Sequence, residues 1–141
     1  MSRGPEGRPI APVVTVQFDR ADRRYEPGTE CRVRYRIEGL GDEKIRAVEH
    51  SLLWYTEGKG EEDLGVHFFQ RIDDHDVPAA GAAEFTVRLP ASPLSYEGVI
   101  VKVRWCARVR IFFRAGRDFV SEHVFEVGDL PPARLPAAGA S

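Results

Sequence analysis

Apolar and polar residues alternate with a period of two along much of this chain. In the clearest case, residues 31–37, four apolar residues share one parity and arginines occupy the other. The apolar residues are Cys31, Val33, Tyr35 and Ile37. Successive side chains of a β-strand point to opposite faces of a sheet, so this pattern predicts a strand with one buried and one solvated face. No stretch shows the sustained period of 3.6 residues that is typical of an amphipathic helix.

Six further segments carry the β-branched and aromatic residues of strands and are separated by turn residues. They are residues 13–18, 45–55, 64–72, 84–89, 99–113 and 119–127. The segment 99–113 is longer than the usual strand of about five or six residues, so we expect a bend or bulge within it. About seven strands separated by turns predict an all-β, two-layer antiparallel sandwich of immunoglobulin-like type.

Residues that share the apolar parity of these strands should form the core of the sandwich. We expect Val33, Tyr35, Val103, Trp105 and Val109 to be buried. The length of 141 residues fits one domain, which we place at residues 13–128. Residues 1–12 are rich in Gly and Pro and are expected to form a flexible leader. Residues 129–141, rich in Pro and Ala, are expected to form a flexible tail.

The segment 89–105 carries a recognisable arrangement of residues. Its elements are Leu89-Pro90, Pro93, Ser95, Tyr96, Gly98 and Trp105. Two prolines, an aromatic residue and a glycine before a long strand resemble the pattern of the arrestin family. This resemblance implies a single arrestin-like sandwich, because arrestins have two such domains in tandem and this chain has room for one. It also implies an adaptor or scaffold role in trafficking or signalling rather than catalysis.

The charge balance restricts the classes of partner. The formal net charge is −2 and the isoelectric point is about 6.1, which argues against a general nucleic-acid-binding protein. No apolar run approaches the ~18 residues of a membrane span, and no basic start followed by an apolar run marks a signal peptide. We therefore expect a cytoplasmic protein without a transmembrane segment.

The two cysteines, Cys31 and Cys106, are far apart in the sequence and form no CxxC or zinc-ligand spacing. In a cytoplasmic protein we expect them to be reduced and not bonded to each other. Cys31 shares the parity of the apolar Val33, whereas Cys106 shares the parity of the charged Lys102. We therefore expect one thiol inside the sandwich and one outside.

The main candidate site is formed by basic residues on the polar parity of two strands. These residues are Arg32, Arg34, Arg36, Lys102, Arg104, Arg108 and Arg110. If the two strands share a sheet, their side chains form a positive field that can bind carboxylates or phosphates. The alternative is an ordinary solvated face, in which acidic residues on neighbouring strands neutralise the cations. The acids available for this are Glu38, Glu84, Glu122 and Glu126.

A second candidate is the charged stretch 57–63, where Glu57 and Lys59 lie at a predicted hairpin tip. The Gly-Lys-Gly within it does not match the GxxxxGK[ST] pattern of a phosphate-binding loop. The stretch is therefore interpreted as a hairpin turn that either contacts a partner or is plain solvated surface.

Catalytic and metal-binding motifs are weak. Residues 73–76, together with His67, could supply carboxylate and imidazole ligands, but no EF-hand spacing is present, and we interpret them as an acidic surface loop. The serines lack a nucleophile elbow, and no base is indicated for Cys106. His50 and His123 are interpreted as structural residues. We expect no catalytic residue, no metal and no cofactor.

These observations leave three functional hypotheses. The first is a non-catalytic, intracellular adaptor or scaffold domain that binds a protein partner through a sheet face, a sheet edge or a loop. The alternative is a sandwich that binds an anionic small molecule or a lipid head group through the arginine-rich face. The third, a metal-dependent enzyme using the acidic loop, has the least support in the sequence.

Overall fold

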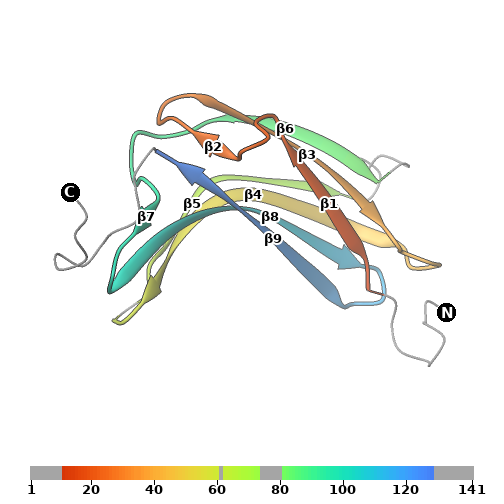
Figure 1. Ribbon diagram of the computed structural model, residues 1–141. Helices are drawn as coiled ribbons and strands as arrows, with labels where there is room; N and C mark the ends of the chain where they lie inside the picture. The colour runs from red at the N-terminus through yellow and green to blue at the C-terminus, as the bar shows by residue number, and fades with distance from the viewer. Residues whose placement is uncertain (1–10, 61, 74–80, 129–141) are drawn as a thin grey trace.

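The computed structural model describes residues 11–60, 62–73 and 81–128 and shows nine strands and no helix among them. The strands form two sheets that pack face to face as an all-β sandwich (Figure 1). They are β1 (Val13–Phe18), β2 (Arg24–Tyr25), β3 (Glu30–Glu38), β4 (Ile45–Gly58), β5 (Leu64–Asp73), β6 (Ala82–Arg88), β7 (Tyr96–Glu97), β8 (Val101–Phe113) and β9 (Asp118–Val127). The seven longer strands correspond to the seven predicted segments. The two extra strands, β2 and β7, have two residues each, too few to show a period.

The small sheet contains β1, β3 and β6, with β3 in the centre and both pairings antiparallel. Along β3 the side chains are alternately exposed and buried without interruption. Cys31, Val33 and Tyr35 point into the core, as the alternation predicts. The arginines between them point to solvent and form the outer face of the small sheet.

The large sheet has the order β2-β9-β8-β4-β5, and β7 pairs with β8. Its pairings are antiparallel except for the parallel contact of β2 with β9. The long strands β4 and β8 pair along almost their whole length, from Ile45–Phe113 to Gly58–Val101. Figure 1 shows that this sheet arches, with its hollow side turned away from the small sheet. We call this outer surface the concave face.

The bend predicted in segment 99–113 is present as the arch of β8 (Figure 1), whereas the bulges lie in β4 and β5. Arg46 is an extra residue of β4 opposite β8, and His67 is an extra residue of β5 opposite β4. A bulge reverses the facing of the residues beyond it. Val66 therefore points to the concave face, while Phe68 packs against the core.

Trp105 lies in the centre of the core and is fully buried. Its indole Nε1 donates a hydrogen bond to the carbonyl of Pro93 at 2.9 Å, which ties β8 to the proline-containing segment. Val33, Tyr35 and Val109 are buried as predicted. The expectation for Val103 is wrong: it is only half-buried, at the end of β8 where the two-residue strand β7 is its neighbour in the sheet.

The described residues include almost all of the predicted domain. The predicted tail, residues 129–141, and the first ten residues of the predicted leader lie outside them. Pro12, the last residue of that leader, is buried directly before β1. Gly98 forms the turn from β7 to β8, where an added Cβ would lie 2.3 Å from the carbonyl oxygen of Val101. A glycine is therefore required at this turn, where the backbone of the chain approaches closely.

Candidate functional site

The outer face of the small sheet carries three of the predicted site residues. Arg34 Nε lies 2.9 Å from a carboxylate oxygen of Glu84 on β6, and Arg32 Nε lies 3.7 Å from the other oxygen. Arg36 has no ion-pair partner among the described residues. One carboxylate therefore serves two arginines, and the third remains available on this face.

The other four predicted cations lie on β8 and point to the concave face, and each has a carboxylate neighbour. The pairs are Lys102–Glu97 (3.5 Å), Arg104–Glu57 (2.8 Å), Arg104–Glu97 (3.1 Å), Arg108–Glu122 (2.6 Å) and Arg110–Asp118 (2.7 Å). Carboxylates on β4, β7 and β9 thus neutralise the row of cations on β8.

The single basic field that would form if the two strands shared a sheet does not exist, because β3 and β8 belong to different sheets. Their polar sides point away from each other on the two outsides of the sandwich. A sequence with two strands of alternating arginines does not show whether those strands are neighbours. The structure brings Arg32, Arg34 and Arg36 together on one face and the β8 cations together on the other.

Exposed apolar side chains gather on the concave face at its two sides. On β5, an edge strand of the sheet, Leu64, Val66 and Phe69 are each just over half exposed (55, 54 and 55%). On β9, Val120 and Val124 are 44 and 40% exposed. The ion pairs of β8 lie between these two groups. We call Leu64, Val66 and Phe69 the β5 apolar strip.

Next to this strip the concave face contains a hollow of about 410 Å³, which we call the acidic hollow. Its lining residues are Tyr55, Thr56, Glu57, Glu62, Asp63, Leu64, Arg108 and Glu122. Glu57 and Glu122 are paired with arginines of β8. Glu62 and Asp63 have no ion pair with any described residue. The hollow therefore retains negative charge that no described cation neutralises.

The predicted hairpin tip is present between β4 and β5. Glu57 is part of β4 and turns toward Arg104, while Lys59 lies in the turn. The backbone N–H of Lys59 donates to the carbonyl of Ile100 at 3.4 Å. Gly58 has a φ of 140°, and an added Cβ would lie 2.1 Å from the Ile100 oxygen. The tip is thus packed against the turn between β7 and β8, and of the two predicted contact residues Glu57 is ion-paired with Arg104.

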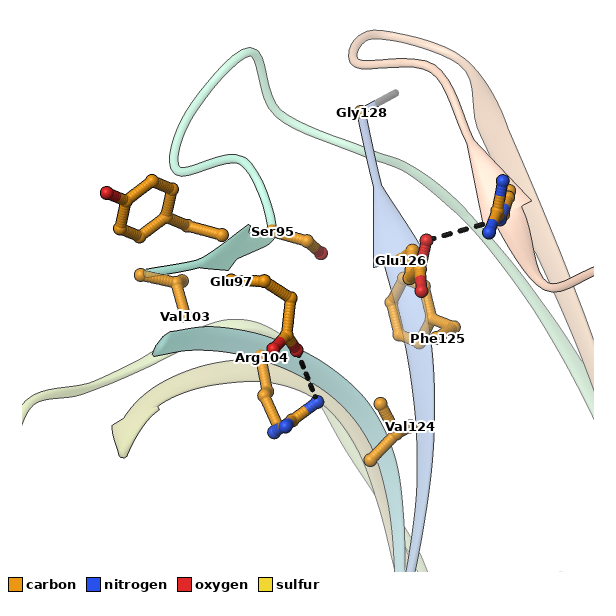
Figure 2. A pocket seen from close by; sticks show the side chains of 10 residues that line it. Ser95, Glu97, Val103, Arg104, Val124, Phe125, Glu126 and Gly128 are labelled. Atoms are coloured by element: carbon orange, nitrogen blue, oxygen red, sulfur yellow. Dashed lines mark ion pairs between the residues drawn. The ribbon is translucent and has the colours of Figure 1, made fainter. Parts of the chain in front are cut away.

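A smaller hollow of about 100 Å³ lies between β7, β8 and β9 (Figure 2). Ser95 is fixed here by its N–H, which donates to the Val127 carbonyl at 2.8 Å, and by its Oγ, which accepts from the Val127 N–H at 2.9 Å. Figure 2 shows the ion pair between Glu97 and Arg104, two of the residues that line this hollow. The charged side chains that line this hollow already form ion pairs with one another.

Both cysteines are free and fully buried, so the expectation that one lies outside is wrong. The Cys106 side chain does point to the outer side of β8, where Cys106 pairs with Leu53 of β4. It is nevertheless buried, because neighbouring side chains on the concave face cover it. Burial raises the pKa of each thiol to about 12. A thiol that stays protonated at neutral pH is a poor nucleophile.

His50 of β4 is buried between the sheets and joins them. Its Nε2 lies 2.9 Å from Gln70 Oε1 on β5, and its Nδ1 lies 2.7 Å from Tyr35 Oη on β3. Because the Gln70 oxygen can only accept, Nε2 donates and Nδ1 accepts the Tyr35 hydroxyl. Burial lowers the pKa of His50, which keeps the ring neutral. The structural role expected for His50 agrees with this network.

The described residues contain no group of three or more His, Cys, Asp or Glu side chains that could hold a metal ion. Of the predicted acidic loop, Asp73 ends β5 and pairs with Arg71 at 3.3 Å, while residues 74–76 lie outside the described ranges. His67 of β5 is 2.8 Å from the carbonyl of Arg88. These two residues do not converge with other ligands.

The β5 apolar strip is not among the sites that the sequence predicted. A strict period of two would place Val66 and Phe68 on the same face of the strand 64–72. The bulge at His67 separates them, and Phe69 joins Val66 outside. The only signal in the sequence is the adjacent pair Phe68-Phe69, which no single parity can bury. Glu62 and Asp63 belong to the charged stretch that the sequence did single out.

No protein-family model matches this chain, and no curated protein matches it by sequence. Among solved structures, Spo0M, a sporulation control protein from Bacillus subtilis, matches with a TM-score of 0.57 and 18% identity, over 85% of this chain and 50% of Spo0M. A superoxide reductase (neelaredoxin) from Ignicoccus hospitalis matches with a TM-score of 0.48 and 12% identity, over 83% and 80% of the two chains.

The likeness to Spo0M shows that this chain has the arrestin-like β-sandwich fold. The chain spans about half the length of Spo0M. In the part of the chain that the structure describes, no helix is long and apolar enough to cross a membrane.

Proposed function

We propose that this chain is a non-catalytic, intracellular protein-interaction domain that binds a protein partner through the concave face of its large sheet. The observation that carries the proposal is the β5 apolar strip. Three large apolar side chains, each more than half exposed, lie together on an edge strand. Exposed apolar clusters with polar surroundings are typical of interaction sites, and edge strands offer unpaired backbone groups.

The fold and the chemistry of the surface support this choice. Arrestin-like sandwiches are known as adaptors and scaffolds, and the neighbour Spo0M is described as a sporulation control protein. The buried, protonated thiols and the neutral, hydrogen-bonded His50 do not form a nucleophile with a base. An adaptor role explains why this domain exposes apolar side chains on the concave face.

The test is affinity capture from a lysate of the source organism, followed by mass spectrometry, with three versions of the chain. The parent should capture a specific protein, and Val66→Lys should lose it. Val13→Lys is the matched control, because Val13 is an equally exposed valine (59%) at the start of β1 in the other sheet. A partner that Val66→Lys retains, or that Val13→Lys loses, contradicts the proposed face.

A second candidate function, anion binding, is favoured by one observation on the small sheet. Arg36, which has no ion-pair partner among the described residues, lines a hollow of about 290 Å³ together with Arg34, Gln17, Thr15 and the carboxylate of Glu38. Arg34 is already paired with Glu84, so the guanidinium of Arg36 is the group that would bind a phosphate or carboxylate here. Calorimetric titration with inorganic phosphate or an inositol phosphate tests this, and Arg36→Glu should abolish any heat of binding.

A further inference from the structure

The concave face also indicates the chemistry of its partner, and this inference rests on the proposed function. We infer that it binds a basic, extended segment of another protein. One Lys or Arg side chain of that segment enters the acidic hollow, and an apolar side chain packs on the β5 apolar strip.

Charge complementarity determines the sign of the charge on the partner. Among the described lining residues of the hollow there are four carboxylates and one guanidinium. Arg108 is 2.6 Å from Glu122, and Glu57 is 2.8 Å from Arg104, so these charges are already neutralised. Glu62 and Asp63 remain exposed without a described cation. An ammonium or guanidinium group would neutralise them, whereas an acidic segment would add to the repulsion.

The hollow and the apolar strip are continuous, because Leu64 belongs to both. Val66 follows two residues later on the same face, and Tyr55 lies opposite Leu64 on β4. The Tyr55 ring supplies an aromatic wall, against which a cation is further stabilised. A single short segment can therefore contact the carboxylates and the apolar side chains together.

The edge position of β5 determines the conformation of the segment. Among the described strands β5 pairs on one side only, with β4, so an extended segment can add to its other side. Alternate residues of an added strand point to the same face of the sheet. The cation and the apolar residue of the partner should therefore be two residues apart.

The experiment is selection of a random 12-residue peptide library, displayed on phage, against the folded chain. We expect the enriched peptides to contain Lys or Arg two residues from a large apolar residue. Fluorescence anisotropy with the best peptide should show at least tenfold weaker binding to the double variant Glu62→Gln/Asp63→Asn. Binding should also weaken as salt is raised from 0.05 to 0.5 M, because exposed charge pairs are screened.

The matched control is Glu30→Gln/Glu38→Gln, which removes two exposed carboxylates from β3 on the other sheet and should leave the affinity unchanged. Circular dichroism checks that all variants fold. The inference is overturned if no peptide is enriched, if the enriched peptides are acidic or uncharged, or if Glu62→Gln/Asp63→Asn binds like the parent.

A further variant, Phe69→Ser, separates this inference from the proposed function. If Phe69→Ser abolishes binding and the carboxylate variant does not, the concave face is the interaction site but its partner is not basic. If neither variant weakens binding, the proposed face is itself contradicted. If instead the parent dimerises in sedimentation experiments and Phe69→Ser alone prevents this, the occupant is a second copy and the inference is wrong.

Discussion

The outer face of the small sheet and the concave face of the large sheet both carry a row of cations, but their surroundings differ. On the small sheet, Glu84 is the carboxylate next to Arg32 and Arg34, and Arg36 has no ion-pair partner among the described residues. On the concave face each of the four β8 cations forms an ion pair with a carboxylate. The acids Glu62 and Asp63 beside them have no ion pair with a described residue. In the part of the chain that the structure describes, the unpaired groups on the small sheet thus include both a cation, Arg36, and the exposed carboxylates of Glu30 and Glu38, whereas those next to the cations of the concave face are acids only.

The apolar content of the two faces differs for a geometric reason. Along β3 the alternation is unbroken, so every apolar side chain reaches the core. On β5 the bulge at His67 turns Val66 outward while Phe68 stays inside. The comparison shows that one extra residue in an edge strand can produce an apolar surface that a regular strand of similar composition does not have.

The largest effect is expected from the core that both faces share. Replacing Trp105 by Ala should lower the free energy of unfolding by about 3–5 kcal/mol, since a fully buried indole and its hydrogen bond to Pro93 are lost. Urea unfolding followed by circular dichroism measures this. If the two faces belong to one folding unit, they unfold in a single transition. A loss below about 1 kcal/mol, or two separate transitions, contradicts the shared core.

The next effect concerns the polar contact between the sheets. Tyr35→Phe removes the donor to His50 Nδ1 and leaves a buried acceptor unsatisfied, which should cost about 1–3 kcal/mol. Tyr96→Phe is the matched control. Because Tyr96 is 45% exposed, removal of its hydroxyl group should cost less than about 0.5 kcal/mol. Equal losses in the two variants would show that the bridge does not couple the faces.

The same bridge predicts a dependence of stability on pH. Burial lowers the pKa of His50 below its usual 6.5, so the unfolded chain binds more protons than the folded chain just below that pH. Stability should therefore fall as the pH decreases from about 7.5 through 6.5. Burial also lowers the pKa of His123, so His50→Gln should reduce this slope and His50→Gln/His123→Gln should remove it. Urea unfolding at several pH values measures the slopes; an unchanged slope refutes the assignment.

The smallest effect on stability is expected from the ion pairs that distinguish the faces. Glu84→Gln should change the free energy of unfolding by less than about 1 kcal/mol, because the pairs are exposed. It should nevertheless leave three unpaired arginines on the small sheet and increase the salt needed for elution from heparin. Glu122→Gln, which frees only Arg108 beside the remaining acids of the hollow, should elute earlier. The reverse order of elution would contradict the charge difference between the faces.

The sequence alone determined the fold class, most of the strands and the buried side of the regular strands such as β3. Turn residues separate the segments, and a period of two is a local property of the strand, so it can be read without knowing the neighbours. The long strand β8 with its buried Trp105, the clean alternation of β3 and the segment 89–105 were all visible in this way. The two-residue strands β2 and β7 were not, since two residues carry no period.

Only the tertiary structure decided which strands are neighbours, and therefore the charge and apolar content of each surface. The arginines of β3 and β8 have the same pattern, yet they lie on opposite outsides of the sandwich and meet different carboxylates. The facing of Val66 and Phe69 depends on a single bulge, and the burial of Cys106 depends on side chains from adjacent strands. Strand order and bulges result from long-range packing, which a local pattern does not encode.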